Sequence, residues 1–498
     1  MSPVDLNSAD RLTLRELPRL RSAAEVRTPA IDPAELSVGI VHLGLGGFHR
    51  AHQAIYLEDA AEATGDTRWG VCGVSQRSAD AVRRLRPQDG LYTVLERGAG
   101  GLSARVVGTV REAIFAGDEP DALRDRIAAE EVRIITVTVT EKGHRRGPDG
   151  GLDLDDPVVR ADLAGEAPPR SAIGRLVRGL QARRAASGAP ITVMSCDNLI
   201  AGGAVLRRLV LDFAAALPAR EGEPLIEWIT GAVRFPSSVV DRIVPAATDA
   251  DRGDAARLLG VRDEAAVATE PFRQWVVEDD FAADRPRLEE VGVIFTADVA
   301  PYEAVKLRLL NASHSLLAYL GALAGYETIA EAVGDPTLAE AAEGLIFEDA
   351  APAITAPPGI DLTEYGRTVL TRFANPALPD RTTRVAMDGS QKLPLRLLGT
   401  VRERLAAGAS PRWATLAVAG WMAYVALGRD AKGRPLPLDD PLADRLREAA
   451  AGVTEPRALV DRLLAVEAIF GADLREDDRF RALLVDHLSS LLRRGGAG

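Results

Sequence analysis

The sequence predicts an α/β domain with a largely parallel, doubly wound sheet, followed by a mostly α-helical domain. Up to about residue 297, short β-rich runs alternate with helical patterns, which is typical of strands joined by crossover helices. From about residue 301 onward, helical periodicity dominates and we find no credible run of strands. We therefore expect two domains, at residues 1–297 and 298–498.

Strands and helices are expected to alternate along the first domain, after a lead-in of about 37 residues. The expected strands are 38–43, 69–74, 91–95, 106–110, 132–140 and 190–196. The expected helices are 50–63, 121–129, 171–186 and 204–216. In the second domain, Pro or Gly residues near positions 335, 357, 376, 408 and 440 separate the helices.

Composition excludes several classes of function. The 498 residues are 47% hydrophobic, which is ample for a large core, and the net charge of -12 would repel a polyanion such as DNA. No run approaches ~18 uninterrupted apolar residues, and the first residues lack the order of a secretory signal. We expect no nucleic-acid partner, no membrane span and a cytoplasmic location, with Cys72 and Cys196 as buried free thiols. Composition leaves monomer and dimer both open.

A glycine-rich turn follows the first expected strand. It reads Gly44-Leu45-Gly46-Gly47-Phe48, and a helical pattern comes next. Strand, turn and helix place backbone N–H groups and a helix N-terminus at one point, which suits a pyrophosphate. His49 stands at the third glycine position of the common dinucleotide fingerprint, so a purely structural turn remains the alternative. Asp80 is the candidate acid for the adenosine ribose and favours NAD over NADP, whereas the neighbouring Arg77 argues the other way.

Three histidines near this turn raise the question of a metal. His49 and His52 are three residues apart and could share a helix face with His42 nearby. No cysteine or carboxylate completes a ligand set of familiar spacing. We expect capping, phosphate contact or core packing for these side chains, and no metal.

Lysine is rare in this chain, with only 4 lysines among the 60 Lys and Arg residues. Lys306 lies in the segment 301–314, which begins with Pro and is predicted to be helical. At about 100° per residue, Glu303, Asn311 and His314 share one face with it, interleaved with leucines. A lysine partly buried among leucines should have a depressed pKa and can take an alcohol proton, which Asn311 and His314 could assist. The alternative is a buried polar network that holds the domains together.

Three further polar segments adjoin apolar runs. Asn198 ends the segment 195–198, at the carboxyl end of an expected strand where ligands of open α/β sheets bind. A turn formed by the Asp-Asn pair is the alternative. Asp241 lies amid apolar residues and could form a simple ion pair, while Lys392 is the unusual residue of a polar turn at 387–394.

Seven stretches resemble the mannitol dehydrogenase family, the polyol-specific long-chain dehydrogenases. They are GLGGFHRAHQA (44–54), TVTEKG (138–143), VMSCDN (193–198), VDRIVPAAT (240–248), EPFRQWVVED (270–279), PYEAVKLRLLNASHS (301–315) and MDGSQKLP (387–394). They span nearly the whole chain, and the K-x-x-x-x-N-x-x-H arrangement together with SCDN is highly specific. The resemblance implies a Rossmann-like N-terminal domain, a helical C-terminal domain, NAD as the cofactor and no metal.

The resemblance also implies a role for each candidate residue. Lys306 would be the general acid/base, and Asn198 and Asn311 would stabilise the oxyanion. His314 would position the reacting oxygen, and Glu303 would relay protons to solvent. The implied substrate contacts are Asp241, Arg384 and Lys392. The implied NAD-binding residues are Gly44, Gly46, Gly47, Phe48 and Asp80.

The substrate is less well defined by the resemblance. EPFRQWVVED, KLRLLN and MDGSQKLP look more like fructuronate reductase (D-mannonate oxidoreductase) than mannitol 2-dehydrogenase. However, Leu199-Ile200 follows SCDN where the family usually has Asn-Gly, and Arg384 is more like the mannitol enzymes. We expect reversible reduction of D-fructuronate to D-mannonate. The alternatives are oxidation of D-mannitol to D-fructose and a catalytically silent NAD-binding regulator, which the intact lysine motif argues against.

Overall fold

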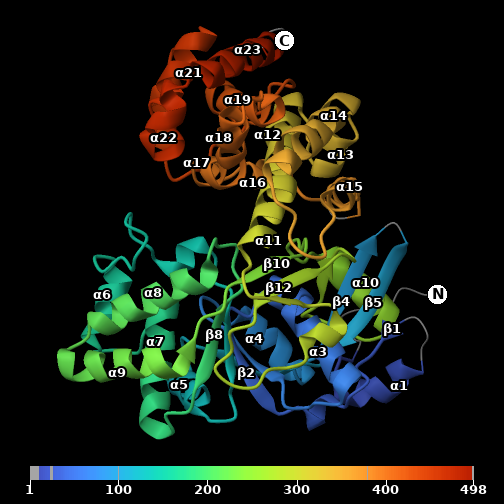
Figure 1. Ribbon diagram of the computed structural model, residues 1–498. Coiled ribbons are helices and arrows are strands. Elements are labelled where there is room, and N and C mark those ends of the chain that lie inside the picture. The colour runs from blue at the N-terminus through green and yellow to red at the C-terminus, as the bar shows by residue number, and fades with distance from the viewer. Residues whose placement is uncertain (1–9, 23–25, 99, 378, 496–498) are drawn as a thin grey trace. The chain divides into compact units, whose positions relative to one another are not determined.

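The computed structural model describes residues 10–22, 26–98, 100–377 and 379–495, and the chain forms two compact units (Figure 1). The first unit spans Met1–Ala300 and the second spans Pro301–Gly498. The first is α/β and the second is helical, so the predicted fold class is confirmed.

A six-stranded parallel sheet forms the centre of the first unit. Its strands, in spatial order, are β6 (Val110–Phe115), β3 (Gly70–Ser75), β2 (Val38–Leu43), β7 (Ile134–Val137), β8 (Ile191–Ser195) and β9 (Val233–Arg234). The chain builds outward from β2 through β3 to β6, and then outward on the other side from β7 to β9. The strand order therefore reverses between β2 and β7, which is the place where such sheets bind ligands.

Both faces of this sheet are covered, as the apolar strands require. Val41 and Leu43 of β2 pack in a cluster with residues of α5 (Pro120–Ala128), α7 (Ala172–Ala186) and α8 (Gly202–Ala215). Ile40, on the opposite face, packs in a cluster with residues of α3 (Gln53–Thr64). Cys72 and Cys196 are buried and unbridged, as predicted.

Two expected strands lie elsewhere than predicted. The run 91–95 belongs to β4 (Tyr92–Gly98), which pairs antiparallel with β5 (Gly101–Val107) in a separate sheet. The run 106–110 divides at Gly108 and Thr109, so that Val110 begins β6 of the central sheet. The prediction failed here because a hairpin with glycines at its turn reverses the chain, and apolar runs alone carry no direction.

The first unit contains two smaller sheets and several short helices. One sheet has the order β1 (Val26–Arg27), β5, β4 and β11 (Val267–Thr269), and the other has β10 (Ser238–Asp241), β12 (Gln274–Glu278) and β13 (Ile294–Thr296). Its remaining α-helices are α1 (Leu17–Arg21), α2 (Gly47–Ala51), α4 (Asp80–Leu85), α6 (Pro157–Ala164), α9 (Ala219–Ala232) and α10 (Asp249–Leu259). Its 3-10 turns are η1 (Leu14–Glu16), η2 (Pro33–Glu35), η3 (Arg86–Gln88), η4 (Glu141–His144) and η5 (Leu288–Val291).

The described residues of the second unit form helices and isolated bridges, with no strand. After α11 (Ala300–Val305) come η6 (Lys306–Asn311), α12 (Ala312–Ala324), α13 (Ile329–Val333), α14 (Pro336–Gly344), η7 (Leu345–Ala350), η8 (Ala351–Ala353), α15 (Leu362–Phe373), α16 (Thr382–Val385), α17 (Gly389–Leu393) and η9 (Pro394–Leu398). They are followed by α18 (Gly399–Ala406), α19 (Arg412–Leu427), α20 (Ala443–Ala450), α21 (Pro456–Leu464), α22 (Glu467–Glu476) and α23 (Asp478–Gly495). The segments η6, η7 and η9 are π-helical turns.

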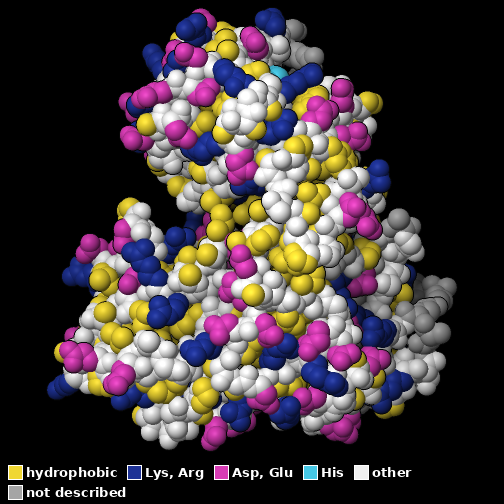
Figure 2. Space-filling model, in the orientation of Figure 1, with side chains coloured by type: hydrophobic (Ala, Val, Ile, Leu, Met, Phe, Trp, Pro, Cys, Tyr) yellow, Lys and Arg dark blue, Asp and Glu magenta, His cyan; other side chains and the backbone are white. Residues whose placement is uncertain are grey.

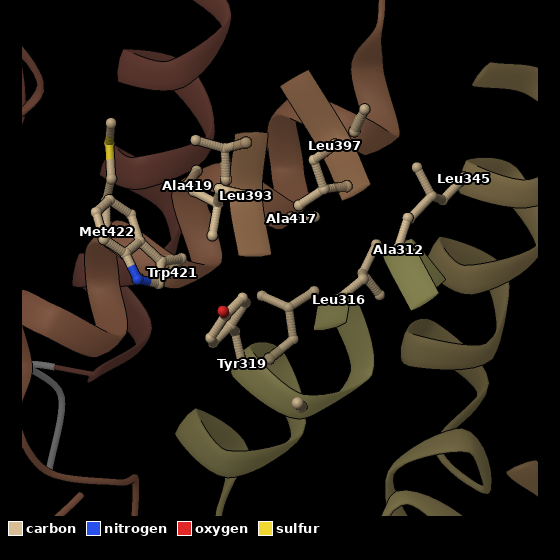
Figure 3. Packing of buried hydrophobic residues seen from close by; sticks show 14 of the residues in the cluster. Ala312, Leu316, Tyr319, Leu345, Leu393, Leu397, Ala417, Ala419, Trp421 and Met422 are labelled. Atoms are coloured by element: carbon tan, nitrogen blue, oxygen red, sulfur yellow. The ribbon is translucent and has the colours of Figure 1, made fainter. Parts of the chain in front are cut away.

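The core of the second unit is centred on α12 and α19 (Figure 3). Leu316 and Tyr319 of α12 and Trp421 of α19 are almost fully buried in one cluster. Gly420 lets the two helices approach closely, because a Cβ there would lie 2.8 Å from Cδ2 of Leu320. This packing fixes the second half of the helix whose first half carries Lys306.

The surface carries charges of both signs. Figure 2 shows basic and acidic side chains interspersed over the visible face, with no broad patch of one sign on it. Among the described residues, the structure contains no helix with the length and hydropathy needed to cross a membrane.

Candidate active site

The carboxyl ends of four central strands lie in one row. The register pairs Leu43 of β2 with Val74 of β3 and with Val137 of β7, and pairs Val137 with Ser195 of β8. The glycine turn after β2, the loop after β7 and the loop before Asn198 therefore leave the same edge of the sheet. This edge includes the switch point between β2 and β7, where open α/β sheets bind ligands.

Two glycines of the turn are required for different reasons. Gly44 has a φ of +118°, and a Cβ there would lie 1.8 Å from the carbonyl oxygen of Thr138. Gly46 is exposed, has an ordinary φ of -97°, and a Cβ there would meet nothing nearer than 3.6 Å. The fold itself demands glycine at 44 but not at 46, so the bare backbone at 46 suits close approach by a ligand. Gly46 is also the N-cap of α2, where N–H groups favour a phosphate, so the turn fits a dinucleotide.

The histidines beside the turn are packing residues. The rings of His42 and His49 stack with their centroids 3.5 Å apart, and both side chains are fully buried. Burial lowers the pKa of His42 to about 4 and holds the pKa of His49 well below its ordinary value, so both are neutral. His42 also bridges the turn to β7, because its Nε2 lies 3.0 Å from the carbonyl oxygen of Gly44 and its Nδ1 lies 2.8 Å from Oγ1 of Thr136. Core packing is therefore the correct alternative for these two rings.

The helix after the turn is broken, whereas the sequence predicted one continuous helix over 50–63. His52 has φ -129° and ψ -86°, which ends α2 and precedes α3. The carbonyl groups freed by this break are bonded by other elements. The carbonyl of Arg50 accepts from the Tyr92 hydroxyl at 2.8 Å, and the carbonyl of Ala51 accepts from Nη1 of Arg242 at 2.6 Å.

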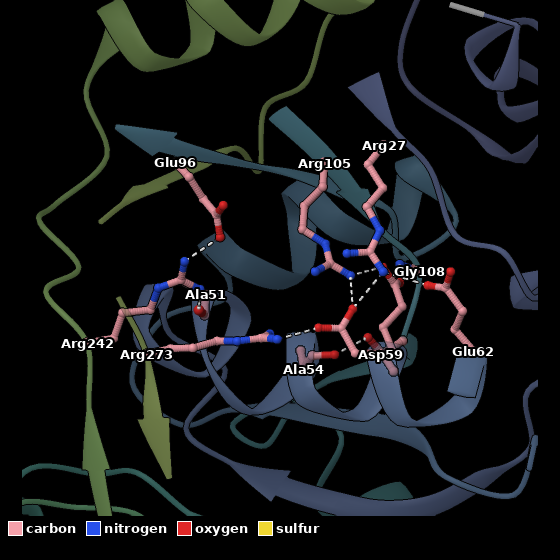
Figure 4. Close-up of polar contacts among 12 residues, drawn as sticks. Arg27, Ala51, Ala54, Asp59, Glu62, Glu96, Arg105, Gly108, Arg242 and Arg273 are labelled. Carbon is pink, nitrogen blue, oxygen red and sulfur yellow. Dashed lines mark hydrogen bonds and ion pairs between the residues drawn. The ribbon is translucent and has the colours of Figure 1, made fainter. Parts of the chain in front are cut away.

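An ionic network, buried at Arg242, Asp59 and Arg105, supports this broken helix (Figure 4). Arg242 also donates to the carbonyl of Glu270 and pairs with the carboxylate of Glu96. Asp59 of α3 pairs with Arg105 at 2.8 Å and with Arg273 at 2.6 Å. Two of these arginines lie in the family-like motifs. Together the three connect the helix behind the glycine turn to the smaller sheets, including β4 and β5.

Asp80 is the first residue of α4, five residues beyond the end of β3. Its side chain is 62% exposed and its carboxylate pairs with Arg83 at 2.5 Å. Hydrogen bonding from Ser78 and Arg83 holds the pKa of Asp80 below its ordinary value. An accessible carboxylate shortly after the strand next to the glycine turn is compatible with a ribose contact, which remains a prediction. Phe48, which is partly buried, stacks on His52 with centroids 5.0 Å apart.

Asn198 is exposed just beyond β8, and its neighbour Asp197 fixes the loop. The buried carboxylate of Asp197 accepts from the N–H groups of Val139 and Thr140, at 3.1 and 2.9 Å, and from Nε2 of His144 at 2.7 Å. Thr140 has the rare φ of +67° for a side-chain-bearing residue. Asp197 thus ties the loop after β7 to the loop that presents Asn198, a role beyond that of a simple turn.

Asp241 ends β10 and is buried, with only 4% exposure. The strand β10 is held at the end of β8, because the Ser238 hydroxyl donates to the carbonyl of Ser195 at 2.8 Å. The first unit therefore brings Asp241 and Asn198 to neighbouring segments. In the same motif, Arg242 forms an ion pair with Glu96.

The polar face of the lysine helix is buried. Glu303, Lys306 and Asn311 are exposed by only 8%, 8% and 9% respectively. The sequence predicted a continuous α-helix, but residues Lys306–Asn311 form a π-turn, in which the N–H of Ala312 donates to the carbonyl of Leu307 five residues back. A π-turn adds a residue to the turn, so Asn311 lies closer to the face of Lys306 than the ~140° offset of an α-helix allows.

Side chains stabilise the carbonyl groups around this π-turn. The Ser313 hydroxyl lies 2.5 Å from the carbonyl oxygen of Leu309 and 3.1 Å from that of Leu310. Nη1 of Arg396, from η9, lies 3.3 Å from the carbonyl oxygen of Asn311 and 3.0 Å from Oγ of Ser315. Short π-turns of this kind are frequent at functional sites.

His314 lies against a carboxylate that the sequence analysis missed. Its Nε2 is 3.2 Å from Oδ2 of Asp380, although the ring N–H is not aligned for a hydrogen bond. Burial alone would raise the pKa of Asp380, but contact with His314 and the charges of Arg384 and Lys392 hold it below its ordinary value. The second unit thus brings His314, Arg384 and Lys392 around Asp380. Arg384 is exposed, while Nζ of Lys392 also donates to the carbonyl of Val385 at 3.1 Å.

Two carboxylates of these segments, Asp380 and Asp197, could not be recognised as functional from the sequence. Asp380 carried no recognisable signal, because its loop precedes α16 in a segment with no clear periodicity. Asp197 was visible only as part of a turn-forming pair.

Among the described residues, no three His, Cys, Asp or Glu side chains are grouped so that they could hold a metal ion.

Two family profiles match the chain. The profile described as "Mannitol dehydrogenase Rossmann domain" matches residues 38–290, and the profile described as "Mannitol dehydrogenase C-terminal domain" matches residues 298–492. The two matches follow the two compact units of the structure.

Similar proteins cover nearly the whole chain. The Escherichia coli protein named uncharacterized oxidoreductase YdfI is 44% identical over 95% of this chain and 96% of its own length. The E. coli D-mannonate oxidoreductase is 42% identical over 94% of this chain and 96% of its own length. The structure of Pseudomonas fluorescens mannitol 2-dehydrogenase, a ternary complex with NAD and D-mannitol, superposes with a TM-score of 0.86 at 38% identity and covers 97% of both chains.

Proposed function

Because the chain belongs to the mannitol dehydrogenase family, we propose that it is an NAD-dependent oxidoreductase that reversibly reduces D-fructuronate to D-mannonate. The observation that carries the proposal is the buried amine of Lys306 on a π-turn, within one helix of Asn311 and His314. Nearly all other cations of the chain are guanidinium groups, which stay protonated and cannot act as a base near neutral pH.

The glycine turn would hold the cofactor. The bare backbone at Gly46 and Gly47 would face the pyrophosphate, Phe48 would lie beside it, and Asp80 would bond the ribose hydroxyls. A carboxylate at that place disfavours the 2′-phosphate of NADP. When bound, NAD supplies the acceptor and donor of hydride.

The chemistry on the substrate oxygen would be performed by the chain itself. Lys306 would take the hydroxyl proton during oxidation and return it during reduction, and Glu303, three residues earlier, would pass that proton on. Asn311, with Asn198 by family resemblance, would donate to the alkoxide, and His314 would orient the hydroxyl. Asp241 would bind a substrate hydroxyl.

A sugar acid is favoured as substrate by the cations near Asp380. Arg384 is exposed and both Arg384 and Lys392 act electrostatically on this carboxylate, so positive charge is available for a substrate carboxylate. The 42% identity to a D-mannonate oxidoreductase supports the same choice. A charge-assisted hydrogen bond contributes ~1.5–3 kcal/mol, enough for at least tenfold specificity.

A mannitol 2-dehydrogenase activity is the second candidate. It is favoured by the similarity to the P. fluorescens enzyme and by Arg384, because an arginine at this position is more like the mannitol enzymes. The hydroxyl groups of a polyol could also use both cations. A silent NAD-binding protein is disfavoured because every residue of the lysine motif is present.

The test is the rate of NADH oxidation with fructuronate and with fructose, followed by absorbance. We expect kcat/KM for fructuronate to exceed that for fructose by at least ~10-fold, with a smaller gap in Lys392→Met or Arg384→Met. Equal or faster reduction of fructose would transfer the assignment to mannitol 2-dehydrogenase. No NADH oxidation with any ketose or keto-acid would overturn the enzymatic proposal, and faster oxidation of NADPH than NADH would overturn the role of Asp80.

A further inference from the structure

Asp380 is held in place by its backbone. Its carbonyl accepts from the N–H of Ile329 at 2.9 Å, and the N–H of Thr382, two residues later, donates to the carbonyl of Glu327 at 3.0 Å. Between them, Arg381 forms an isolated antiparallel bridge with Thr328. The loop before α16 is thus fastened to the segment before α13, and the carboxylate of Asp380 extends from a fixed point.

His314 is held by contacts on two sides. Its imidazole stacks on Phe373 of α15, with centroids 4.9 Å apart and an angle of 23° between the ring planes. The edge of the ring that carries Nε2 lies 3.2 Å from Oδ2 of Asp380, and the side chains of His314 and Asp380 are only 14% and 17% exposed. The aromatic stack sets the plane of the imidazole, and the carboxylate lies at the edge of the ring that carries Nε2.

The charges around the ring favour one tautomer. The groups that act on His314 are one carboxylate, Asp380, and two cations, Arg396 and Lys392; Arg384 acts on Asp380 itself. Burial is the largest influence and lowers the pKa of His314, the two cations lower it further, and only Asp380 raises it. The ring is therefore neutral near pH 7. A carboxylate beside Nε2 stabilises a proton on that nitrogen, which leaves Nδ1 with its lone pair.

We propose that Asp380 is a positioning residue that keeps the proton of His314 on Nε2, so that Nδ1 accepts a hydrogen bond from a substrate hydroxyl next to the reacting carbon, whose own hydroxyl proton goes to Lys306. This inference rests on the proposed function, because it gives His314 its task in orienting the substrate, and with it the reacting oxygen. A histidine in the opposite tautomer would present a donor there, so this neighbouring hydroxyl would have to turn its proton away from the ring. The same carboxylate partly offsets the positive charge of Arg384 and Lys392.

The test compares Asp380→Asn and Asp380→Glu with Asp444→Asn, whose aspartate is fully exposed and pairs with Arg447 at the surface. The first measurement is NMR of protein labelled with ¹⁵N-histidine, in which His314→Gln assigns the signal among the 6 histidines. We expect the Nε2-protonated form in the wild type, in Asp380→Glu and in the control. In Asp380→Asn the amide can donate to Nε2, so the other tautomer should appear and the pKa of His314 should fall, because the group that raised it is gone.

The second measurement is steady-state kinetics with a melting curve. Asp380→Asn should lower kcat at least ~10-fold with a smaller change in KM, and Asp380→Glu should recover part of the loss. An unchanged tautomer in Asp380→Asn, or a kcat within about threefold of the control, would overturn the inference. A lowered melting temperature in Asp380→Asn, together with no recovery of kcat in Asp380→Glu, would also overturn it, because Asp380 would then have a structural role only. Failure of the proposed function is separate, because it would appear as full activity in Lys306→Ala while the NMR result still stood.

Discussion

The glycine turn after β2 and the helix that carries Lys306 present functional groups by opposite means. The turn uses bare backbone: Gly44 lets the chain pass Thr138, and a Cβ at Gly46 would meet no atom of the described residues nearer than 3.6 Å. The helix uses side chains that are more than nine-tenths buried, on a π-turn whose carbonyls are bonded by Ser313 and Arg396. Substitutions in the turn should therefore act through the backbone and folding, and substitutions in the helix should act through chemistry.

The largest expected effect separates the fold from the ligand site within the turn. Gly44→Ala should lower the free energy of unfolding by at least ~3 kcal/mol, because the new Cβ meets the carbonyl of Thr138 at a φ of +118°. Urea unfolding followed by circular dichroism measures the change. A stable Gly44→Ala protein would mean that the turn can adopt another path.

The next effect concerns chemistry in the helix. Lys306→Ala should reduce kcat at least ~100-fold, the usual scale for a lost general base, while NADH binding stays intact. Lys432→Ala is the matched control, since Lys432 bonds the carbonyl of Gly325 and lies at an exposed turn of the same unit. Stopped-flow or steady-state kinetics of both variants measures the change in kcat. More than a tenth of wild-type turnover in Lys306→Ala would contradict the assignment.

The third effect is a pH dependence of stability in the turn. Burial lowers the pKa of His42 to about 4 in the folded protein, against 6.5 for an exposed histidine. The unfolded chain therefore binds more protons between these values, so His42 contributes stability above pH 6.5 that is lost as the pH falls toward 4. When the pH falls from 7 to 5, the stabilisation lost from this residue is about 2 kcal/mol.

Isolating this contribution requires a variant, because His49 is also buried and neutral. In His42→Asn, the decrease in unfolding free energy between pH 7 and 5 should be smaller than in the wild type by about 2 kcal/mol. Urea titrations at the two pH values measure it. An equal decrease in both proteins would show that His42 does not titrate in this window.

A smaller effect is expected at the ligand side of the turn. Gly46→Ala should weaken NADH binding by about tenfold, or ~1.4 kcal/mol, because a methyl group would occupy the space where a ligand meets the backbone. Its melting temperature should match the wild type, since the Cβ contacts nothing within 3.4 Å. Quenching of tryptophan fluorescence by NADH measures the affinity. If Gly46→Ala binds NADH normally but melts earlier, the glycine serves the fold.

No effect is expected from metal removal. The proposed lysine takes the task that zinc performs in other alcohol dehydrogenations, which is to ease loss of the hydroxyl proton. Dialysis against a strong chelator should leave the rate unchanged. A rate that collapsed and returned on addition of Zn²⁺ would refute the lysine assignment.

Much of the first unit could be predicted because parallel strands are locally encoded. The strand β2 was predicted with its observed bounds, and β8 and α7 were each found within one residue at either end. Buried strands consist of short apolar runs, and their crossover helices carry the 3.6-residue pattern, so neighbouring residues suffice to identify both. The family profile and the relatives confirm the fold class and the family.

By itself, then, the sequence determined most strands of the central sheet and their crossover helices, the family and the residue types of the site, since these depend on local pattern and motif. Only the tertiary structure decided the break at His52, the π-turn at Lys306 and the partners Asp197 and Asp380. Each of these depends on groups distant in the chain, such as Arg242 bonding Ala51 or Arg396 bonding Asn311. A freed carbonyl or a buried ring must find its partner in space, and the spacing of residues along one segment carries no information about that partner.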